Sequence, residues 1–340
     1  MTMRALVVHG PRDARVDDVP VPTPGAGELL VRVDRAGICG TDVELFTGEM
    51  AYYARGRTHH PLRPGHEWTG TVVEVGSESE GLWVGRRVIG DTMLGCGRCA
   101  ACRGGRHHLC PDRREVGITD GWPGMLAEYA LVPTRFAHYV PDAVSTDAAA
   151  LVEPGANALR AVRAAGADHG SRLLIMGDGT IGLLAALFAV DAGAEVTVSG
   201  LRPERLALAA RLGAAATARA DRPTDTTAPA SYDAVLDATS DPTAPGSALT
   251  LVRPGGRLVL IGLAGTPSLL DTRDLVLADV TAVGILSASP ALADTLRAYA
   301  GGLDPTPIVA ETVGLDEVPH RLAGLGGTGP GPKVLVDPHG

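Results

Sequence analysis

The chain has 340 residues, a length that corresponds to about two domains. Hydrophobic residues make up 45% and charged residues 20%, with 44 glycines and 25 prolines, so the composition is globular and rich in turns and excludes a disordered or collagen-like chain. The formal net charge of −9 disfavours broad binding to nucleic acid or to an anionic membrane surface.

The first half of the chain is predicted to be rich in β-structure. Short β-branched runs at residues 4–9, 28–35, 70–75 and 86–89 are separated by glycine and proline, a pattern typical of strands. The N-terminal segment has no apolar signal core with a small-residue cleavage site. The longest apolar run, residues 181–190, is too short for a membrane span. We therefore expect a cytosolic protein with no membrane partner.

Two short motifs in this half contain the ligand types of a catalytic zinc site. Cys39 precedes Gly-Thr-Asp, and His66 and Glu67 follow Gly65. A single cysteine or a single His–Glu pair is more often a packing feature. Together, however, Cys, His and a carboxylate can hold a zinc ion that keeps one position open for water or substrate.

Four cysteines follow at the spacing Cys96-x2-Cys99-x2-Cys102-x7-Cys110. Four thiolates on a glycine-rich loop fit a closed, tetrahedral, structural zinc site. An iron–sulfur cluster is the rival interpretation, and free surface thiols are a third. The spacing favours zinc, and a cluster of this kind is typical of a reducing compartment.

The second half predicts alternating helices and strands, and thus a parallel sheet with helices on both faces. Residues 146–167 have the residue periodicity of a helix. Strands are then predicted at 173–176, 195–199, 234–237, 257–261 and 280–285, helices at 179–192 and 203–212, and a polar loop at 219–230. A helix at 291–299 and a strand at 333–336 end the chain. The sequence pattern does not decide whether this helix and strand belong to the α/β half or to the β-rich half of the protein.

A glycine fingerprint lies between the first of these strands and the helix that follows. Gly177-Asp-Gly179-Thr180-Ile181-Gly182 fits a dinucleotide-binding turn, in which the glycines admit a pyrophosphate to the helix N-terminus; a tight turn without a ligand is the alternative. NAD-binding folds place a carboxylate at the end of the next strand, where this chain has Ser199 and Gly200. Arg202 can pair with a 2′-phosphate, so the sequence favours NADP, with NAD as the alternative.

Taken in order, these motifs and Val152-Glu153-Pro154 resemble the zinc-dependent medium-chain dehydrogenase/reductase family, and within it the glucose, polyol and amino-cyclitol dehydrogenases. The resemblance implies an α/β protein with a GroES-like β-barrel catalytic domain (residues 1–153 and 290–340) and a Rossmann domain (154–289). It also implies that Glu153 joins Cys39, His66 and Glu67 around a catalytic zinc.

Further residue roles follow from the same resemblance. Thr41 would pass the alcohol proton outward, and Glu44 stands where many family alcohol dehydrogenases have a relay histidine. Glu44 and Glu115 would bind substrate hydroxyl or ammonium groups, with a solvated surface as the alternative for both. Lys333, the only lysine, would lie near the cofactor pyrophosphate.

The expected function is hydride transfer between NADP and a secondary alcohol of a sugar, amino sugar or cyclitol. The expected cofactors are one catalytic and one structural zinc, and the expected assembly is a homodimer or homotetramer. The alternatives are a simple alcohol dehydrogenase and an NAD-dependent polyol dehydrogenase. A binding protein without catalysis is disfavoured because all candidate zinc ligands are present.

Overall fold

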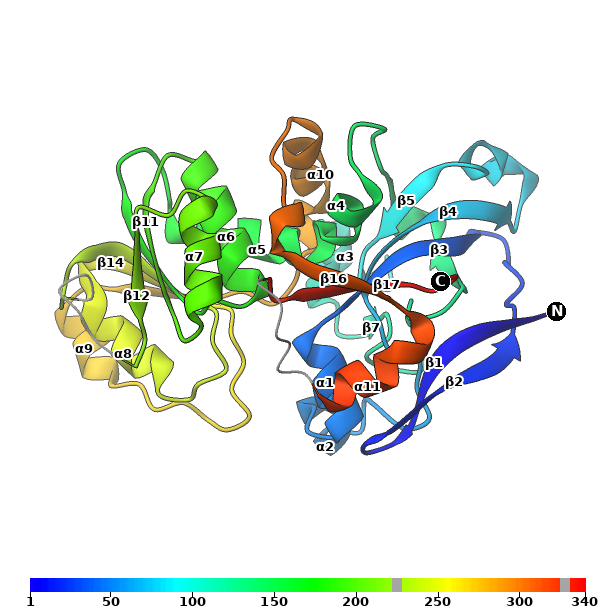
Figure 1. The fold of residues 1–340 in the computed structure, drawn as a ribbon, viewed down its shortest axis with the longest axis horizontal. Coiled ribbons are helices and arrows are strands. Elements are labelled where there is room, and N and C mark those ends of the chain that lie inside the picture. Colours follow the sequence, from blue (N-terminus) through cyan, green and yellow to red (C-terminus); the bar gives the residue numbers. More distant parts are fainter. Residues whose placement is uncertain (222–227, 325–330) are drawn as a thin grey trace. The chain divides into compact units, whose positions relative to one another are not determined.

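The computed structural model describes residues 1–221, 228–324 and 331–340, and two compact units divide the chain. The first contains Met1–Glu153, the segment that begins at Leu292 and the final residues Lys333–Gly340, and the second contains Pro154–Ala291 together with Pro332. The fold class expected from the sequence is confirmed, with a GroES-like unit and a Rossmann unit (Figure 1). Among the described residues, no helix is long and apolar enough to cross a membrane.

The first unit is built around a sheet of seven strands. Its strand order is β16-β17-β3-β4-β5-β9, and β8 also pairs with β3. The strands of this unit are β1 (Thr2–Gly10), β2 (Asp13–Pro20), β3 (Glu28–Ile38), β4 (Glu67–Val75), β5 (Arg87–Gly90), β6 (Met93–Leu94), β7 (Arg114–Glu115), β8 (Tyr129–Pro133), β9 (Ala137–Tyr139), β16 (Val309–Gly314) and β17 (Lys333–Asp337). Its helices are α1 (Gly40–Thr47), α2 (Ala51–Ala54), α3 (Ala100–Arg103), α4 (Thr146–Ala150), α10 (Leu292–Ala300) and α11 (Val318–Ala323).

The last strand decides where the C-terminal tail belongs. β17 pairs with β3 in antiparallel register, with Val334 opposite Ile38 and Leu335 opposite Gly37. On the other side of β3, Gly37 is opposite Glu67 at the start of β4. The tail therefore returns to the first unit and brings Lys333 to the same end of the sheet as Glu67.

The core of the first unit is formed by apolar side chains that alternate along these strands. Leu29, Val31 and Val33 of β3 are fully buried, as alternation on one face of a strand requires. Trp68, Val88 and Val336 continue the same core on the neighbouring strands. This packing fixes the ends of β3 and β4, which lead directly into the candidate zinc ligands.

The second unit is a parallel sheet of six strands in the order β12-β11-β10-β13-β14-β15. Numbered within the unit, this is the strand order 3-2-1-4-5-6 of a dinucleotide-binding fold. The strands are β10 (Arg172–Met176), β11 (Glu195–Gly200), β12 (Ala216–Arg219), β13 (Tyr232–Asp237), β14 (Val252–Leu260) and β15 (Thr281–Gly284). The helices are α5 (Val152–Ala165), α6 (Thr180–Asp191), α7 (Pro203–Arg211), α8 (Ala244–Leu251) and α9 (Thr272–Leu277).

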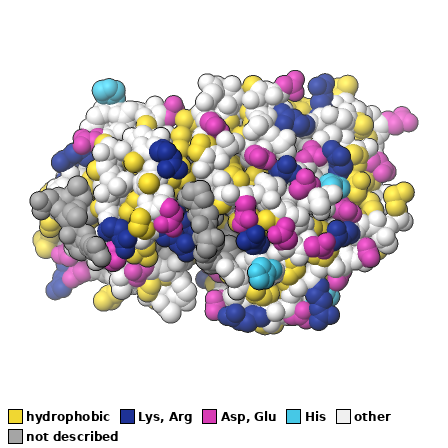
Figure 2. Space-filling model, viewed as in Figure 1, with side chains coloured by type: hydrophobic (Ala, Val, Ile, Leu, Met, Phe, Trp, Pro, Cys, Tyr) yellow, Lys and Arg dark blue, Asp and Glu magenta, His cyan; other side chains and the backbone are white. Residues whose placement is uncertain are grey.

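Several details differ from the sequence-based expectation. The helical stretch expected at 146–167 is two helices, α4 and α5. Elements that were not predicted include β2, β8, β9, β12, β16, α1, α8, α9 and α11. The polar run expected at 219–230 begins at the last residue of β12, and its residues 222–227 lie outside the described residues. Figure 2 shows arginine and acidic side chains interspersed over one face of the molecule.

Candidate active site

Three side chains of different ligand type, two buried and one partly buried, converge at one end of the first unit's sheet. Cys39 caps the N-terminus of α1, directly after β3, while His66 and Glu67 stand where β4 begins. One potential ligand atom of each residue lies within 4.8 Å of the other two. His66 is 5% exposed and Glu67 is 1% exposed. A thiolate, an imidazole and a carboxylate at such distances fit a zinc ion with an open position.

A buried carboxylate holds the two backbone segments of this group together. Asp42 Oδ2 accepts a hydrogen bond from the Cys39 backbone N–H at 2.8 Å, and Asp42 Oδ1 accepts one from the Gly65 N–H at 3.1 Å. Burial raises the pKa of Asp42, although the nearby His66 lowers it. The sequence analysis did not assign a role to Asp42. Its place three residues after Cys39, the spacing of a helix cap, was the available signal.

The protonation of His66 is set by its neighbours. Burial lowers its pKa, but the Cys39 thiol and the carboxylates of Asp42 and Glu153 raise it, and the net pKa lies well above the ordinary value. His66 Nδ1 has no hydrogen-bond partner among the described residues and lies 3.7 Å from Asp42 Oδ1. A metal ion would take the place of the proton on such an imidazole. The Glu153 carboxylate raises the pKa of His66, but Glu153 does not belong to the group of three potential zinc ligands.

Glu67 has a counter-ion in the same buried space. Lys333 Nζ donates a hydrogen bond to Glu67 Oε2 at 2.5 Å and another to the Ile38 carbonyl oxygen at 2.9 Å. A Cβ atom on Gly37 would overlap the Glu67 carboxylate, so glycine is required there. The structure thus places Lys333 on Glu67, and the pyrophosphate contact that the resemblance implies stays a prediction. The placement on Glu67 follows from the position of Lys333 at the start of β17, which turns the ammonium into the unit.

The two expected catalytic residues lie on one short helix next to Cys39. Thr41 and Glu44 are separated by three residues on α1, close to one helical turn. Both are partly buried, and burial raises the pKa of Glu44, with a smaller effect from Glu49. The alternative that Glu44 is a solvated surface residue therefore holds only for the exposed part of its side chain.

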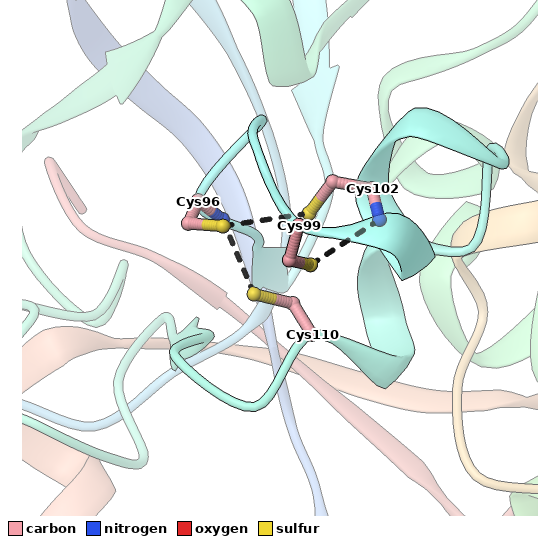
Figure 3. A group of neighbouring side chains, drawn as sticks. All are labelled: Cys96, Cys99, Cys102 and Cys110. Atoms are coloured by element: carbon pink, nitrogen blue, oxygen red, sulfur yellow. Dashed lines mark hydrogen bonds between the residues drawn. The ribbon is translucent and has the colours of Figure 1, made fainter.

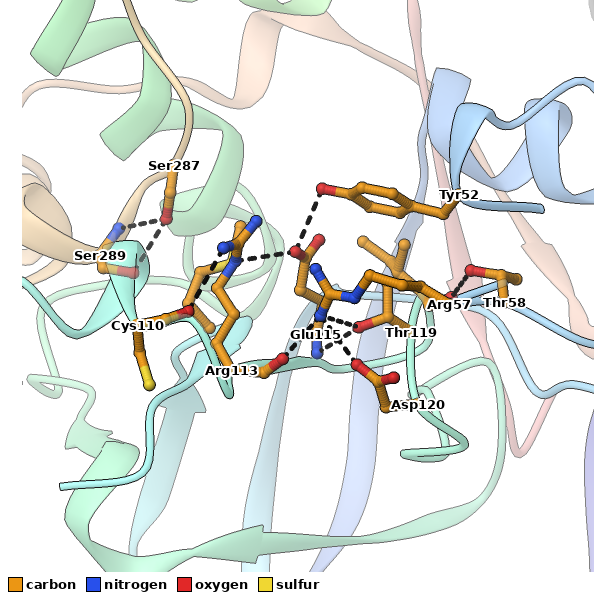
Figure 4. A network of polar contacts seen from close by, with 12 residues as sticks. Tyr52, Arg57, Thr58, Cys110, Arg113, Glu115, Thr119, Asp120, Ser287 and Ser289 are labelled. Atoms are coloured by element: carbon orange, nitrogen blue, oxygen red, sulfur yellow. Dashed lines mark hydrogen bonds and ion pairs between the residues drawn. The ribbon is translucent and has the colours of Figure 1, made fainter. Parts of the chain in front are cut away.

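Glu115 belongs to a polar network near the same end of the unit (Figure 4). Its Oε1 accepts a hydrogen bond from Arg113 Nε at 2.9 Å and from the Tyr52 hydroxyl at 3.2 Å. Glu115 is 2% exposed, so the alternative of a solvated surface residue is wrong. The next residue donates its N–H to the Thr92 carbonyl oxygen, and the Thr92 hydroxyl donates to the His66 carbonyl oxygen at 3.4 Å. The network is therefore connected to the zinc-ligand group.

The four clustered cysteines form a second group, away from Cys39 (Figure 3). Their sulfur atoms lie within 4.8 Å of one another, and Cys110 is fully buried. Backbone N–H groups of Arg98 and Cys99 lower the pKa of Cys96 to about 6, whereas burial raises the pKa of Cys102 to about 12. Four converging sulfurs fit a closed tetrahedral zinc site without an open position.

The glycine fingerprint forms the turn between β10 and α6. Gly177 has φ 114°, which favours glycine, and a Cβ there would lie 2.9 Å from the Ala238 carbonyl oxygen. Gly179 caps the N-terminus of α6, which begins with Thr180 and Ile181. A Cβ on Gly182 would overlap the carbonyl of Gly177. The turn therefore has the close backbone packing and the open helix N-terminus that a pyrophosphate needs.

The end of β11 contains a carboxylate that the sequence analysis missed. Asp178 Oδ2 accepts hydrogen bonds from the backbone N–H groups of Leu201 at 2.9 Å and Arg202 at 2.7 Å. A Cβ on Gly200 would lie 2.5 Å from the Asp178 Cβ. The inference that Gly200 leaves this strand end without a carboxylate is therefore wrong. The carboxylate comes from the glycine turn instead, because the register of β10 and β11 brings Met176 beside Ser199.

Two arginines accompany this carboxylate. Burial lowers the pKa of Arg205, the neighbouring Arg202 lowers it further, and Asp178 opposes both effects. The Arg205 Nε is buried without a hydrogen-bond partner among the described residues. Glu204 also lies here, with its Oε1 3.9 Å from Arg202 Nη1, so two guanidinium groups face two carboxylates at this strand end.

Comparisons with known proteins agree with this arrangement. Residues 25–142 match the alcohol dehydrogenase GroES-like domain, and residues 180–300 match the zinc-binding dehydrogenase model. The chain is 32% identical to an L-threonine 3-dehydrogenase of Enterobacter sp. (strain 638), over 88% of this chain and 89% of the relative. An L-threonine 3-dehydrogenase of Marinomonas sp. (strain MWYL1) is 29% identical, over 97% of this chain and 98% of the relative.

Solved structures show the same fold. A zinc-binding dehydrogenase from Sinorhizobium meliloti 1021, bound to NADP, has a TM-score of 0.91 and 30% identity, covering 99% of this chain and 100% of that one. The 2R,3R-butanediol dehydrogenase of Bacillus subtilis has a TM-score of 0.87 and 26% identity, with 99% of both chains covered.

Proposed function

The chain belongs to the zinc-dependent medium-chain dehydrogenase/reductase family, and we propose that it oxidises a secondary alcohol of a small polyhydroxylated molecule with NADP as hydride acceptor. Sugars, amino sugars and cyclitols are the substrate classes that we favour. Cys39, His66 and Glu67 support the enzymatic assignment most directly, because a largely buried group of this composition fits a catalytic zinc.

Zinc bound by these residues would polarise the substrate oxygen and make its proton easier to remove. The nicotinamide would accept the hydride. Thr41, two residues after Cys39, would take the hydroxyl proton and pass it outward. Asp42 keeps Cys39 and the segment before His66 in place, and Lys333 balances the charge of Glu67.

A polyhydroxylated substrate is supported by the polar character of the network around Glu115. Tyr52, Arg113 and Glu115 offer hydroxyl, guanidinium and carboxylate groups, whereas a simple aliphatic or aromatic alcohol would require an apolar surface. We assign Glu44 and Glu115 as the groups that would bind substrate hydroxyls or an ammonium group.

A β-hydroxy amino acid is the second candidate substrate, because the two curated relatives described above are L-threonine 3-dehydrogenases. Its carboxylate would need a cationic partner. In the network the two arginines already have carboxylate partners, Arg57 with Asp120 at 2.8 Å and Arg113 with Glu115 at 2.9 Å. This pairing engages both guanidinium groups, and it engages Glu115 in the same way, so any substrate group would have to compete with an existing ion pair.

The cofactor assignment is supported by the two guanidinium groups that follow β11. Arg202 and Arg205 can attract a 2′-phosphate, while Asp178 already accepts two backbone hydrogen bonds. We therefore propose that NADP is preferred and that NAD is also accepted. Clustered thiols support a cytosolic location, and a homodimer or homotetramer remains an expectation from the family resemblance.

One assay tests the function. The enzyme loaded with two zinc ions is incubated with NADP and with NAD, each against sugars, cyclitols, aminoglycosides, 2,3-butanediol and L-threonine. We expect the highest kcat/KM with NADP and a polyhydroxylated substrate. The highest value with L-threonine would support the second candidate, and no turnover with any alcohol would contradict both.

A further inference from the structure

A cleft in the first unit lies apart from the zinc-ligand group. Its volume is about 550 Å³, and its walls include Val7, Pro61, Arg63, Ile118, Trp122 and Pro123. We call it the Trp122 cleft. A smaller hollow of about 240 Å³ adjoins it and shares Arg63 and Trp122. The volume of the larger cleft falls in the range of small-molecule sites, and none of the candidate zinc ligands lines it.

Arg63 is the unusual side chain of the Trp122 cleft. It is half-buried, and among the described residues its guanidinium has no hydrogen bond or ion pair. Burial lowers the pKa of its guanidinium, and no neighbouring carboxylate offsets that effect. Taking a charge partly out of water without a partner is unfavourable. An anion in the cleft would supply the missing partner.

The other charged groups of the cleft and hollow already have partners. Asp120 accepts a hydrogen bond from Arg57 at 2.8 Å. Glu28 lines the smaller hollow, and its carboxylate accepts the Gly25 backbone N–H at 3.0 Å. Arg114 also lines the hollow, where its guanidinium carbon lies 6.0 Å from the centre of the Trp122 ring. In the larger cleft, which Glu28 does not line, Arg63 is therefore the charged side chain left without a partner among the described residues.

The rest of the wall is suited to an apolar molecule. Val7, Pro61 and Ile118 present hydrocarbon surface, and Trp122 adds an aromatic ring at the junction with the hollow. The backbone beneath Arg63 is fixed, since its carbonyl oxygen accepts the Gly124 N–H at 2.8 Å. The cleft is therefore formed by the fold itself, without a ligand.

We propose that the Trp122 cleft is a binding site for a small organic anion, with its apolar body against Trp122 and its anionic group on Arg63. This site is separate from the proposed catalytic function. A carboxylate or a phosphate monoester on an aromatic or aliphatic skeleton has the required chemistry, because both anions match the planar donors of a guanidinium.

The test uses two probes of the same shape, 2-naphthoate and neutral 2-naphthamide. Both are titrated calorimetrically into the full chain, loaded with zinc and saturated with NADP so that the proposed cofactor site is occupied. We expect 2-naphthoate to bind more tightly than 2-naphthamide. Arg63→Met should weaken the binding of 2-naphthoate by about ten- to a hundredfold, as expected for the loss of a charge-assisted contact. The affinity for 2-naphthamide should not change.

Control variants separate binding from folding. Arg63→Lys keeps the charge and should retain part of the preference for the anion, while Arg86→Met removes an exposed arginine that does not line the cleft and should change nothing. Quenching of tryptophan fluorescence by 2-naphthoate should disappear in Trp122→Phe. Equal affinity for both probes, equal binding by Arg63→Met and the wild type, or no binding at all would overturn the proposal.

Discussion

Lys333 Nζ lies 2.5 Å from Glu67 Oε2, and the two residues are each 1% exposed. They are 266 positions apart in the chain. β3 brings them together, because it pairs with β4 on one side and with β17 on the other. The buried cation thus balances a carboxylate that is itself a candidate zinc ligand.

Lys333→Met should destabilise the protein, because it leaves the buried Glu67 carboxylate without its counter-ion. Breaking a buried pair on one side costs about 3–5 kcal/mol in the free energy of unfolding. Denaturant unfolding of the zinc-free protein measures this loss. The double variant Lys333→Met with Glu67→Gln should recover most of it, and a single variant as stable as the wild type would contradict the role of the pair.

The same pair predicts a pH dependence. Burial lowers the pKa of Lys333, but Glu67 and Cys39 raise it, and the net pKa lies above the ordinary value of 10.5. A raised pKa for a base means that the stabilisation is complete below 10.5 and is lost as the pH rises through the folded-state pKa. The difference in stability between the wild type and Lys333→Met should therefore be constant near neutral pH and shrink only in strong alkali.

Asp42→Asn should weaken zinc binding at the Cys39 group. The Asp42 carboxylate accepts two backbone N–H groups and faces His66, and an amide offers only one accepting oxygen. Loss of a partner that orients metal ligands costs about 10–100-fold in metal affinity. Chelator competition measures this affinity. Unchanged affinity in Asp42→Asn would show that the loop keeps its shape without the carboxylate.

Cys96→Ser and Cys39→Ser should have different consequences. Each should reduce bound zinc from about two ions per chain to about one, because each removes a thiolate from a separate site. Cys96→Ser should also lower the melting temperature, since a closed structural site stabilises its loop. Cys39→Ser should abolish turnover and leave the fold largely intact. Elemental analysis and thermal unfolding measure these effects, and full zinc content with an unchanged melting temperature in Cys96→Ser would contradict the assignment.

Thr41→Val should lower kcat by about 10²–10⁴, the usual contribution of a positioned proton-transfer group. The cofactor dissociation constant should barely change, because Thr41 lies beside Cys39 and belongs to the first unit. Thr47→Val, at the other end of α1, is the matched control and should retain activity. A near-normal kcat in Thr41→Val would mean that another group or a water chain moves the proton.

Arg202→Ala should reduce the preference for NADP over NAD by about ten- to a hundredfold in kcat/KM, as expected for a charge-assisted contact to a phosphate. Arg211→Ala, in the last turn of the same helix, is the control. An unchanged cofactor ratio in Arg202→Ala would mean that Arg202 does not contact the phosphate. Gly200→Asp is not a usable test, because any Cβ at Gly200 would collide with Asp178.

The sequence was sufficient for those features that depend on local pattern. Cysteine spacing identified the four-sulfur group, and strand, glycine turn and helix followed one another as expected from Leu173 to Asp191. Alternating helices and strands also predicted the parallel sheet, because such a pattern has few compact solutions. These features involve residues that are close in the chain.

The tertiary structure alone decided the contacts between distant segments. No local pattern could place Lys333 on Glu67 or enclose Glu115 with Arg113 and Tyr52, because strand pairing and burial set those partners. The register between β10 and β11 likewise placed the Asp178 carboxylate beside Gly200, where the sequence had indicated an empty strand end. Ligand types are determined by the sequence, whereas counter-ions and the shape of a site are determined by which strands become neighbours.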